Sequence, residues 1–321
     1  MDFLANYFGS LNPMSFLSAL PGNIAQGIIW GLMGLGVFLT FKLLNFADLS
    51  VDGSFATGGA VTAVMLINGC PVWATIIVAI LAGLAAGLVT GLLHTLLGIP
   101  DILAGILTQI ALYSINLNIM GKSNLPISYR NYTLVVSASN INMAILVGLG
   151  ICAVVIAAMY WYFGTEQGST IRSTGSNPAM SKAQGININF TKVIALALSN
   201  GLVALSGSLF AQYQGFADIN MGRGAIVIGL AAVIIGEVLG EAIFRKHMNF
   251  IIRMHFVIVG GILYYIAMGI VLWLKMPTDD TKLFTAIIVA IFLAVPYLQK
   301  KRKTSFKKVA KMNAKNAQKE G

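Results

Sequence analysis

Long apolar runs constrain this chain more than any other feature of its sequence. A helix needs about 20 mostly apolar residues to cross a bilayer, and nine such runs can be drawn. The chain is 57% hydrophobic and only 10% charged, whereas a soluble domain carries about 25% charged residues. The sequence therefore predicts an all-α polytopic membrane protein with about nine transmembrane helices, within a range of about eight to ten. The predicted spans are 24–41, 50–67, 72–96, 101–120, 143–163, 190–213, 223–240, 254–275 and 283–299.

The two ends of the chain differ from this pattern. The first segment, 1–22, is apolar but contains Pro13 and Pro21, so we expect it to lie in the membrane interface. Residues 23–300 form the predicted transmembrane domain. The last segment, 301–321, is basic, and we expect a cytosolic tail that contacts anionic membrane lipid. A short tail of this kind gives no reason to expect a nucleic-acid partner.

Lysine and arginine residues in the loops set the orientation, because cytosolic loops of membrane proteins are enriched in them. Placing the C-terminus in the cytosol puts 16 of the 21 Lys and Arg residues on that side. The other 5, Arg223 among them, fall outside. The sequence therefore predicts an N-terminus outside, a C-terminus in the cytosol and a cytosolic loop at 164–189.

Shifting the chain by 170 residues reveals a weak internal repeat. Residues 24–60 and 194–230 match at 10 of 37 positions without a gap, and both copies contain Phe-Ala-Asp. In the predicted topology the two copies start on opposite sides of the membrane, so spans 1–4 and 6–9 form an inverted repeat. Inverted repeats are characteristic of transporters, because mirrored halves can exchange conformations to give alternating access. The repeat therefore favours a transport protein.

One polar segment interrupts the chain between the fifth and sixth spans. The Asn-Pro pair at 177–178 is a good helix start, and Gly185 is a good residue to end that helix. Ala179, Met180 and Ala183 would form a small apolar patch on an otherwise polar cytosolic helix. Such a patch can dock into a groove of another protein. A solvated loop helix without a partner is the alternative that these residues leave open.

Two segments resemble a known family. NFADLSVDGSFATGGAV at 45–61 and RSTGSNPAMSKAQGININ at 172–189 are similar to permease subunits of binding-protein-dependent ABC importers, in the branched-chain amino-acid, ribose and nucleoside permease family. LGIPDILAGILTQIALYSINLNIMG and LSNGLVALSGSLFAQYQGFADINMG resemble a subgroup found beside aromatic amino-acid-type or uncharacterised binding proteins. The resemblance implies inward transport of a small polar solute, an amino acid and in particular an aromatic one, with nucleosides and sugars left open. It also implies ATPase coupling by Asn177, Pro178, Ala179, Met180, Ser181, Lys182, Ala183, Gln184 and Gly185.

The same resemblance implies partners. A P-loop needs G-x-x-x-x-G-K-[ST], but the Gly-Lys-Ser at 121–123 has Asn116 where the motif requires glycine. ATP and Mg²⁺ would therefore bind a separate ABC ATPase, present in two copies, and this chain would hold no cofactor and act as a transport subunit rather than an enzyme. One coupling helix per chain implies a second permease subunit, in a homodimer or with a related chain. An extracytoplasmic solute-binding protein completes the set, in the bacterial cytoplasmic (inner) membrane.

Polar residues inside the predicted spans are candidates for the transport path. Asp48 and Asp52 are four residues apart, so we expect them on one helix face near the cytosolic side. Asp218 is the repeat mate of Asp48, near the outer side. These carboxylates would act as gates or would cap the helices that follow. Uncharged polar residues would line the path or form interhelical hydrogen bonds. The path candidates are Gln109, Tyr113 and Asn116 in the fourth span, and Ser199, Asn200 and Gln212 in the sixth.

Other functions have less support. Cys70 and Cys152 are far apart, and the three histidines show no ligand spacing, so no metal site is predicted. Membrane prenyltransferases use an Asp-x-x-x-Asp like that at 48–52, but they need a second acidic cluster on a facing helix. Glu237 and Glu241 are expected to form ion pairs with the basic residues at 245–246 instead. An ion-coupled secondary transporter is the main alternative, since it shares the inverted repeat but needs no coupling helix.

Overall fold

The computed structural model describes residues 13–130, 132–244, 248–274, 283–292 and 294, and these are mainly helical. Seven of the described helices are long and apolar enough to cross a membrane, and two shorter apolar helices, α3 (Val51–Ile67) and Leu283–Phe292, fall within the other predicted spans. The basic tail at 301–321 lies outside the described residues. The long helices are α2 (Pro13–Val37) with its π-helical end η1 (Phe38–Leu43), α4 (Val72–Thr95), α5 (Asp101–Met120), α6 (Ile141–Phe163), α9 (Ile188–Gln214), α10 (Ala225–Phe244) and α11 (Phe250–Trp273).

The first helix is longer than predicted. α2 begins at Pro13 rather than at residue 24, and it continues through Pro21. Proline suits the first turn of a helix, where its missing N–H has no partner to lose, and proline within membrane helices is tolerated when neighbouring groups satisfy the freed carbonyl. Residues 13–22 are therefore continuous with the first span. The interfacial position of 1–22 stays a prediction, and residues 1–12 lie outside the described part of the chain.

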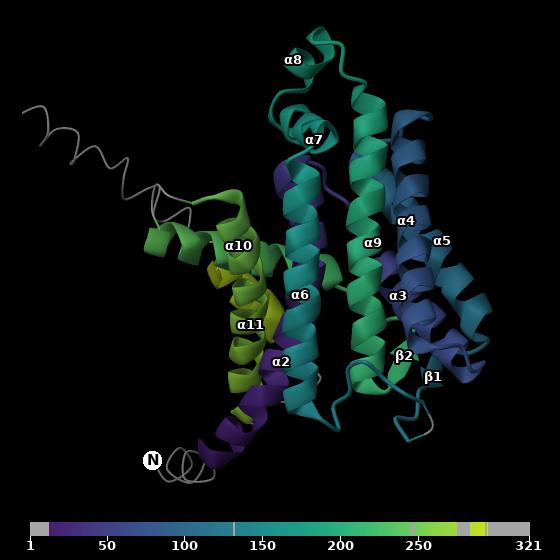
Figure 1. Ribbon diagram of the computed structural model, residues 1–321, viewed down its shortest axis with the longest axis vertical. Helices are drawn as coiled ribbons and strands as arrows, with labels where there is room; N and C mark the ends of the chain where they lie inside the picture. The colour runs from purple at the N-terminus through teal and green to yellow at the C-terminus, as the bar shows by residue number, and fades with distance from the viewer. Residues whose placement is uncertain (1–12, 131, 245–247, 275–282, 293, 295–321) are drawn as a thin grey trace, which may run out of the picture.

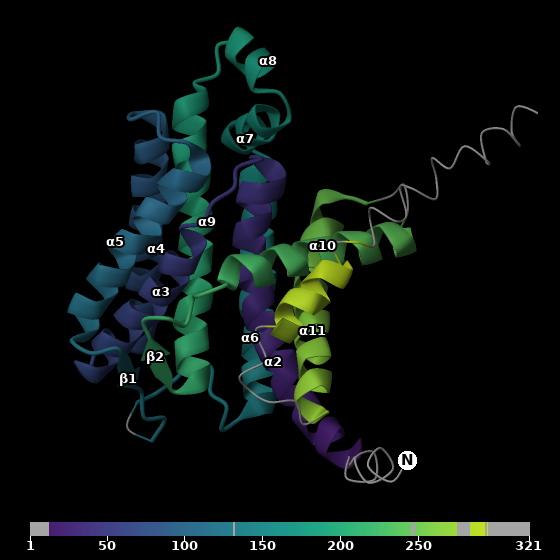
Figure 2. The same cartoon turned by 180° about the vertical axis from the view of Figure 1, so that it is seen from behind.

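Two helices form the centre of the bundle. In the 18-residue apolar stretch of α2 with η1, 83% of the residues are buried, and in that of α9 72% are buried. The other long helices described bury at most 39% of theirs. α2 and α9 run in opposite directions (Figure 1). Each is followed by a non-helical segment: residues 44–50 lead from η1 into α3, and residues 215–224 lead from α9 into α10. Figures 1 and 2 show that α3 and α10 begin partway along the bundle, and that α10 crosses α2.

Close backbone contact joins α4 to α9. Gly83, Gly87 and Gly91 are spaced by four residues on one face of α4. A Cβ atom on Gly83 or Gly87 would collide with a backbone carbonyl oxygen of α9, and one on Gly91 would lie 2.8 Å from the Cα of Val193. Small residues allow membrane helices to approach in this way. The two helices therefore pack as one unit.

The segment between α6 and α9 contains two helices, although only one was predicted. α7 (Glu166–Ser176) and α8 (Pro178–Ala183) project from one end of the bundle (Figure 1). At the opposite end, β1 (Asn124–Pro126) pairs with β2 (Phe216–Asp218) in an antiparallel register that places Asn124 opposite Asp218. The second Phe-Ala-Asp copy is thus a strand, whereas the first lies in the irregular segment 44–50.

Candidate functional site

A buried polar cluster joins the two repeat copies. Asp48 is 1% exposed, and its Oδ1 accepts hydrogen bonds from the N–H of Ser50, at 2.9 Å, and from the Ser50 hydroxyl. Its Oδ2 accepts from Asn200 Nδ2 at 2.8 Å. The side-chain oxygen of Asn200, Oδ1, accepts hydrogen bonds from the hydroxyls of Ser50 and Ser54. Since Asn200 lies near the middle of α9, Asp48 lies deep in the bundle. The sequence predicts a position near one end instead, on the expected cytosolic side.

Asp52 caps a helix of the other repeat copy. Its two carboxylate oxygens accept hydrogen bonds from the N–H groups of Gly224 and Ile226, both at 2.9 Å. The first amides of a helix lack intrahelical partners, so a carboxylate on α3 stabilises the start of α10. The prediction that Asp48 and Asp52 share a helix face is wrong, because α3 begins only at Val51 and Asp48 lies before it.

Asp218 makes one local hydrogen bond and one contact across the β1–β2 pair. Its Oδ1 accepts from the N–H of Asn220 at 2.7 Å, and its Oδ2 lies 3.4 Å from the side-chain nitrogen of Asn124. It does not cap α10, the helix that follows, because Asp52 fills that role. The contacts of all three carboxylates are thus with backbone N–H groups and neighbouring polar side chains, and a gating role for them remains a prediction.

A cavity of about 270 Å³ gathers half of the predicted path residues. Gln109, Tyr113 and Asn116 line it from α5, together with Asp52 of α3 and Arg223, which precedes α10. Asn116 has no exposed surface, and neither its Oδ1 nor its Nδ2 has a hydrogen-bond partner among the described residues. A buried amide in this state is costly unless water or a solute pairs with it. This small cavity is therefore the best candidate for solute contact.

The other three path candidates, Ser199, Asn200 and Gln212, face the protein core. All three are fully buried, and none lines the small cavity. The Ser199 hydroxyl donates to the carbonyl oxygen of Gly36 at 2.8 Å, and Gln212 Oε1 accepts from the N–H of Val135 at 3.0 Å. Asn200 belongs to the Asp48 cluster. Interhelical hydrogen bonding, the alternative drawn from the sequence, describes the contacts of Ser199 with α2 and of Asn200 with α3, whereas Gln212 bonds to a loop residue.

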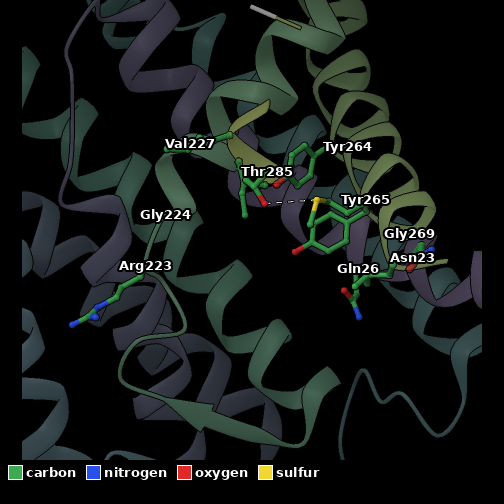
Figure 3. Close-up of a pocket in the computed structure, with 13 residues that line it drawn as sticks. Asn23, Gln26, Arg223, Gly224, Val227, Tyr264, Tyr265, Gly269 and Thr285 are labelled. Atoms are coloured by element: carbon green, nitrogen blue, oxygen red, sulfur yellow. Dashed lines mark hydrogen bonds between the residues drawn. The ribbon is translucent and has the colours of Figure 1, made fainter. Parts of the chain in front are cut away.

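A larger cavity of about 510 Å³ lies between α2, α10 and α11 (Figure 3). Its polar lining includes Asn23 and Gln26 of α2, and Tyr264 and Tyr265 of α11. Sequence reasoning missed these residues, although Asn23 and Gln26 stand three apart in an apolar run. Arg223 lines both cavities. Figure 3 shows its guanidinium directed away from the tyrosines.

The short helix α8 has the predicted caps. Asn177 Oδ1 accepts from the N–H of Met180 at 3.1 Å. Gly185 is left-handed, with φ at 82°, and the N–H of Ile186 donates to the Ser181 carbonyl oxygen at 3.1 Å, which is the glycine-ended form of helix termination. Of the predicted coupling residues, Ser181 is buried, and the exposed ones are Asn177, Pro178, Ala179, Met180, Lys182, Ala183, Gln184 and Gly185.

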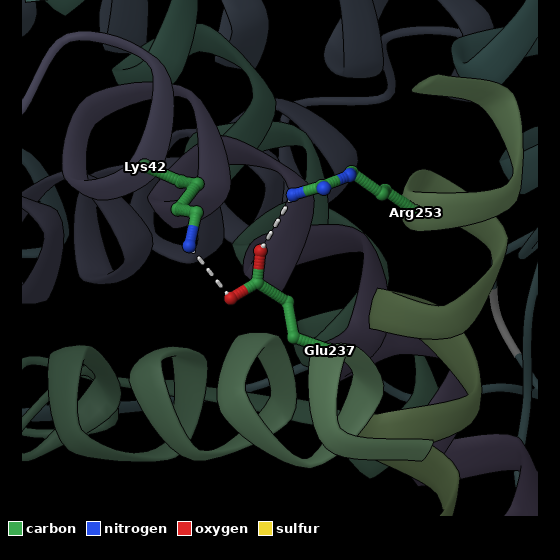
Figure 4. A network of polar contacts seen from close by, with 3 residues as sticks. All are labelled: Lys42, Glu237 and Arg253. Atoms are coloured by element: carbon green, nitrogen blue, oxygen red, sulfur yellow. Dashed lines mark hydrogen bonds and ion pairs between the residues drawn. The ribbon is translucent and has the colours of Figure 1, made fainter. Parts of the chain in front are cut away.

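An ion-pair cluster ties η1, α10 and α11 together (Figure 4). Glu237 accepts from Lys42 Nζ at 2.8 Å and from Arg253 at 3.2 Å. A structural ion pair at Glu237 was predicted, but with the basic residues at 245–246, which lie outside the described residues. No described ion pair involves Glu241.

These features define a class of protein: a multi-pass helical membrane protein with polar cavities between its helices, as in a permease. Comparison with known proteins gives the particular family. Residues 22–296 match the family described as branched-chain amino acid transport system / permease component, and the chain belongs to it. A tyrosine transport system permease protein of Clostridioides difficile (strain R20291) is 42% identical over 301 residues, covering 93% of this chain and 99% of that protein.

More distant relatives are consistent with this assignment. The D-allose transport system permease protein of Escherichia coli (strain K12) is 27% identical over 261 residues, covering 80% of this chain and 77% of that protein. Among solved structures, PsaBC from Streptococcus pneumoniae in complex with Fab superposes with a TM-score of 0.51 at 16% identity. That match covers 91% of this chain and 94% of the other, and it supports the fold alone.

Proposed function

We propose that this chain is the membrane-spanning permease subunit of a bacterial ABC importer that moves an amino acid into the cell. Membership of the permease family supports the transport role, and the name of the C. difficile relative supports an amino acid, with an aromatic one as the first choice. Nucleosides and sugars are the alternatives, as the name of the E. coli relative illustrates.

Alternating access by two inverted halves is the proposed mechanism. α2 and α9 begin the two repeat copies and run in opposite directions, and both are followed by a break before a helix that starts within the bundle. Discontinuous helices where inverted repeats meet are typical of transporter binding sites. In this proposal spans 1–4 and 6–9 exchange conformations around the level of these two breaks. The chain lies in the inner membrane with its N-terminus outside and its C-terminus in the cytosol.

One observation carries the ABC assignment: α8 is capped at both ends and presents Met180, 58% exposed, at the end of the bundle. An isolated helix this short is unstable in water, so its two caps favour a preformed docking element. We propose that Asn177 to Gly185 bind a cleft in a separate ATPase, which holds ATP and Mg²⁺. Two ATPases, a second copy of this permease and an extracytoplasmic binding protein complete the assembly.

The test is co-purification of this chain with the ABC ATPase whose gene lies nearest to the gene of this chain. We expect the native permease and a Met180→Leu variant to retain the ATPase, because both keep an apolar side chain at the contact. Met180→Asp should release it, since a carboxylate would be buried without a partner. If the native permease retains no ATPase, an ion-coupled carrier becomes the leading alternative. Equal retention by Met180→Asp would remove α8 from the contact.

A further inference from the structure

Arg223 precedes α10, lines both cavities and has an exposed side chain that pairs with no carboxylate among the described residues. It follows Gly222, whose Cα packs directly against the backbone carbonyl of Asp52, so it lies at the level where α3 begins. The outer-loop position predicted for Arg223 is therefore wrong. No ion pair among the described residues neutralises its charge. An unpaired charge inside a membrane protein is costly and marks a functional site by default.

The small cavity offers a second charge of opposite sign. Asp52 lines it together with Arg223, yet the two groups form no ion pair with each other. The Asp52 carboxylate is held in place by the amides of Gly224 and Ile226. A carboxylate has about four lone-pair positions, so two amide bonds leave room for a further donor. A fixed anion and a cation thus lie on one cavity without neutralising one another.

An independent observation indicates that this cavity takes a polar ligand. Asn116 contributes one donor group and one acceptor to its lining, both buried and without a partner among the described residues. Gln109 and Tyr113 add polar atoms on the same side. At about 270 Å³, the cavity is slightly smaller than most ligand pockets, which run from about 300 Å³. A small, strongly polar solute fits these dimensions.

We propose that the small cavity binds the ionised head group of an α-amino acid, with Arg223 pairing with its carboxylate and Asp52 with its ammonium group. A guanidinium matches a carboxylate with two parallel hydrogen bonds. In this proposal the unpartnered amide of Asn116 supplies further hydrogen bonds to the same head group. Neutral sugars and nucleosides carry neither charge and would leave both residues unpaired. This inference rests on the proposed function, since it names the solute class of that transport path.

The experiment measures ligand-induced thermal stabilisation of the purified full-length permease. The probes are L-tyrosine, L-leucine and glycine, which share the head group, together with tyramine, which lacks the carboxylate, and 3-(4-hydroxyphenyl)propionate, which lacks the ammonium group. We expect at least one amino acid to raise the melting temperature, and neither tyrosine analogue to do so. Arg223→Gln should weaken that binding about tenfold or more, Arg223→Lys should weaken it less, and Arg130→Gln, at an exposed outer-loop position, should leave it unchanged.

Several results would overturn the proposal: no stabilisation by any of the three amino acids, stabilisation by tyramine equal to that by L-tyrosine, or unchanged binding in Arg223→Gln. Asn116→Leu is the second variant, because it carries no charge change and should also weaken binding. The melting temperature of each variant without ligand reports whether it has folded. ATPase retention needs no ligand, so a failure of the head-group site and a failure of the ABC assignment are separate results.

Discussion

Asp48 and Asp218 are 170 positions apart and make the same hydrogen bond, each accepting from the backbone N–H two residues later, at 2.9 and 2.7 Å. The bond preserves a local trace of the repeat in segments that otherwise differ. Only Asp48 also reaches the other repeat copy, through Asn200. The two aspartates therefore form the same local turn, but only the turn at Asp48 is hydrogen-bonded to the second repeat copy.

Replacing each of these aspartates with asparagine should separate the two roles. In Asp48→Asn the new amide nitrogen replaces one carboxylate oxygen, so it meets either the Ser50 N–H or Asn200 Nδ2, and both of these are donors. We expect a loss of about 1–3 kcal/mol, because a buried donor is left unpaired. The Asp218 side chain is half-buried, so Asp218→Asn should change the free energy of unfolding by less than about 0.5 kcal/mol. Thermal unfolding of both purified variants measures the difference, and equal stability losses would contradict it.

Adding a methyl group to the α4 glycine face should destabilise the bundle. In Gly87→Ala the new Cβ meets the carbonyl oxygen of Leu196, so we expect a loss of about 1–3 kcal/mol from overpacking. Gly150 lies inside α6 with no atom within 4 Å of an added Cβ. Gly150→Ala should therefore be neutral or stabilise the helix by up to about 1 kcal/mol. The melting temperatures of the two variants should move in opposite directions or differ clearly in size.

Removing the cap of α8 should weaken ATPase binding without affecting the spans. Asn177→Ala loses the bond to the Met180 N–H, and such caps contribute about 0.5–2 kcal/mol. We expect several-fold weaker ATPase binding in a titration of the purified permease, with an unchanged melting temperature. Ser176→Ala, one residue earlier on the exposed surface, is the matched control. Unaltered affinity in Asn177→Ala would show that the docking surface does not depend on a preformed helix.

The ion-pair cluster at Glu237 should contribute a salt-dependent stabilisation. The side chain of Glu237 is 17% exposed and pairs with two cations, so Glu237→Gln should lower stability by about 1 kcal/mol at low salt. The loss should shrink at about 1 M salt, where charges are screened over about 3 Å. Glu241→Gln lacks a described partner and should have no effect. A loss that is insensitive to salt would point to packing rather than charge.

Local signals in the sequence predicted more of the structure than long-range ones. Each span follows from an apolar run, and the caps of α8 follow from Asn177, Pro178 and Gly185, because these effects act within a few residues. α7 was missed, since its residues are polar and carry no long apolar run. The start of α2 at Pro13 was also missed, because prolines were taken as interruptions although the first turn of a helix accommodates one.

Partnerships between distant residues could not be predicted. Nothing in the sequence pairs Asp52 with the amides of α10, or Asp48 with Asn200, because both contacts arise only when the two repeat copies pack. Polar residues in spans were equally ambiguous. Asn116 and Asn200 are the same residue type in similar surroundings, yet one faces a cavity without a partner and the other is fully hydrogen-bonded.

The glycine face of α4 determines which helices would move together if the proposed ATPase displaced α8. α8 is joined to α9 by only a few residues, and α9 meets α4 backbone to backbone, with no layer of side chains that could slide between them. Thr90 of α4 in turn donates to Thr108 of α5 at 2.9 Å, next to Gln109 in the wall of the small cavity. A displacement of α8 would therefore move α9, α4 and α5 together. The α5 wall of the small cavity, which faces Asp52 and Arg223, would move with them.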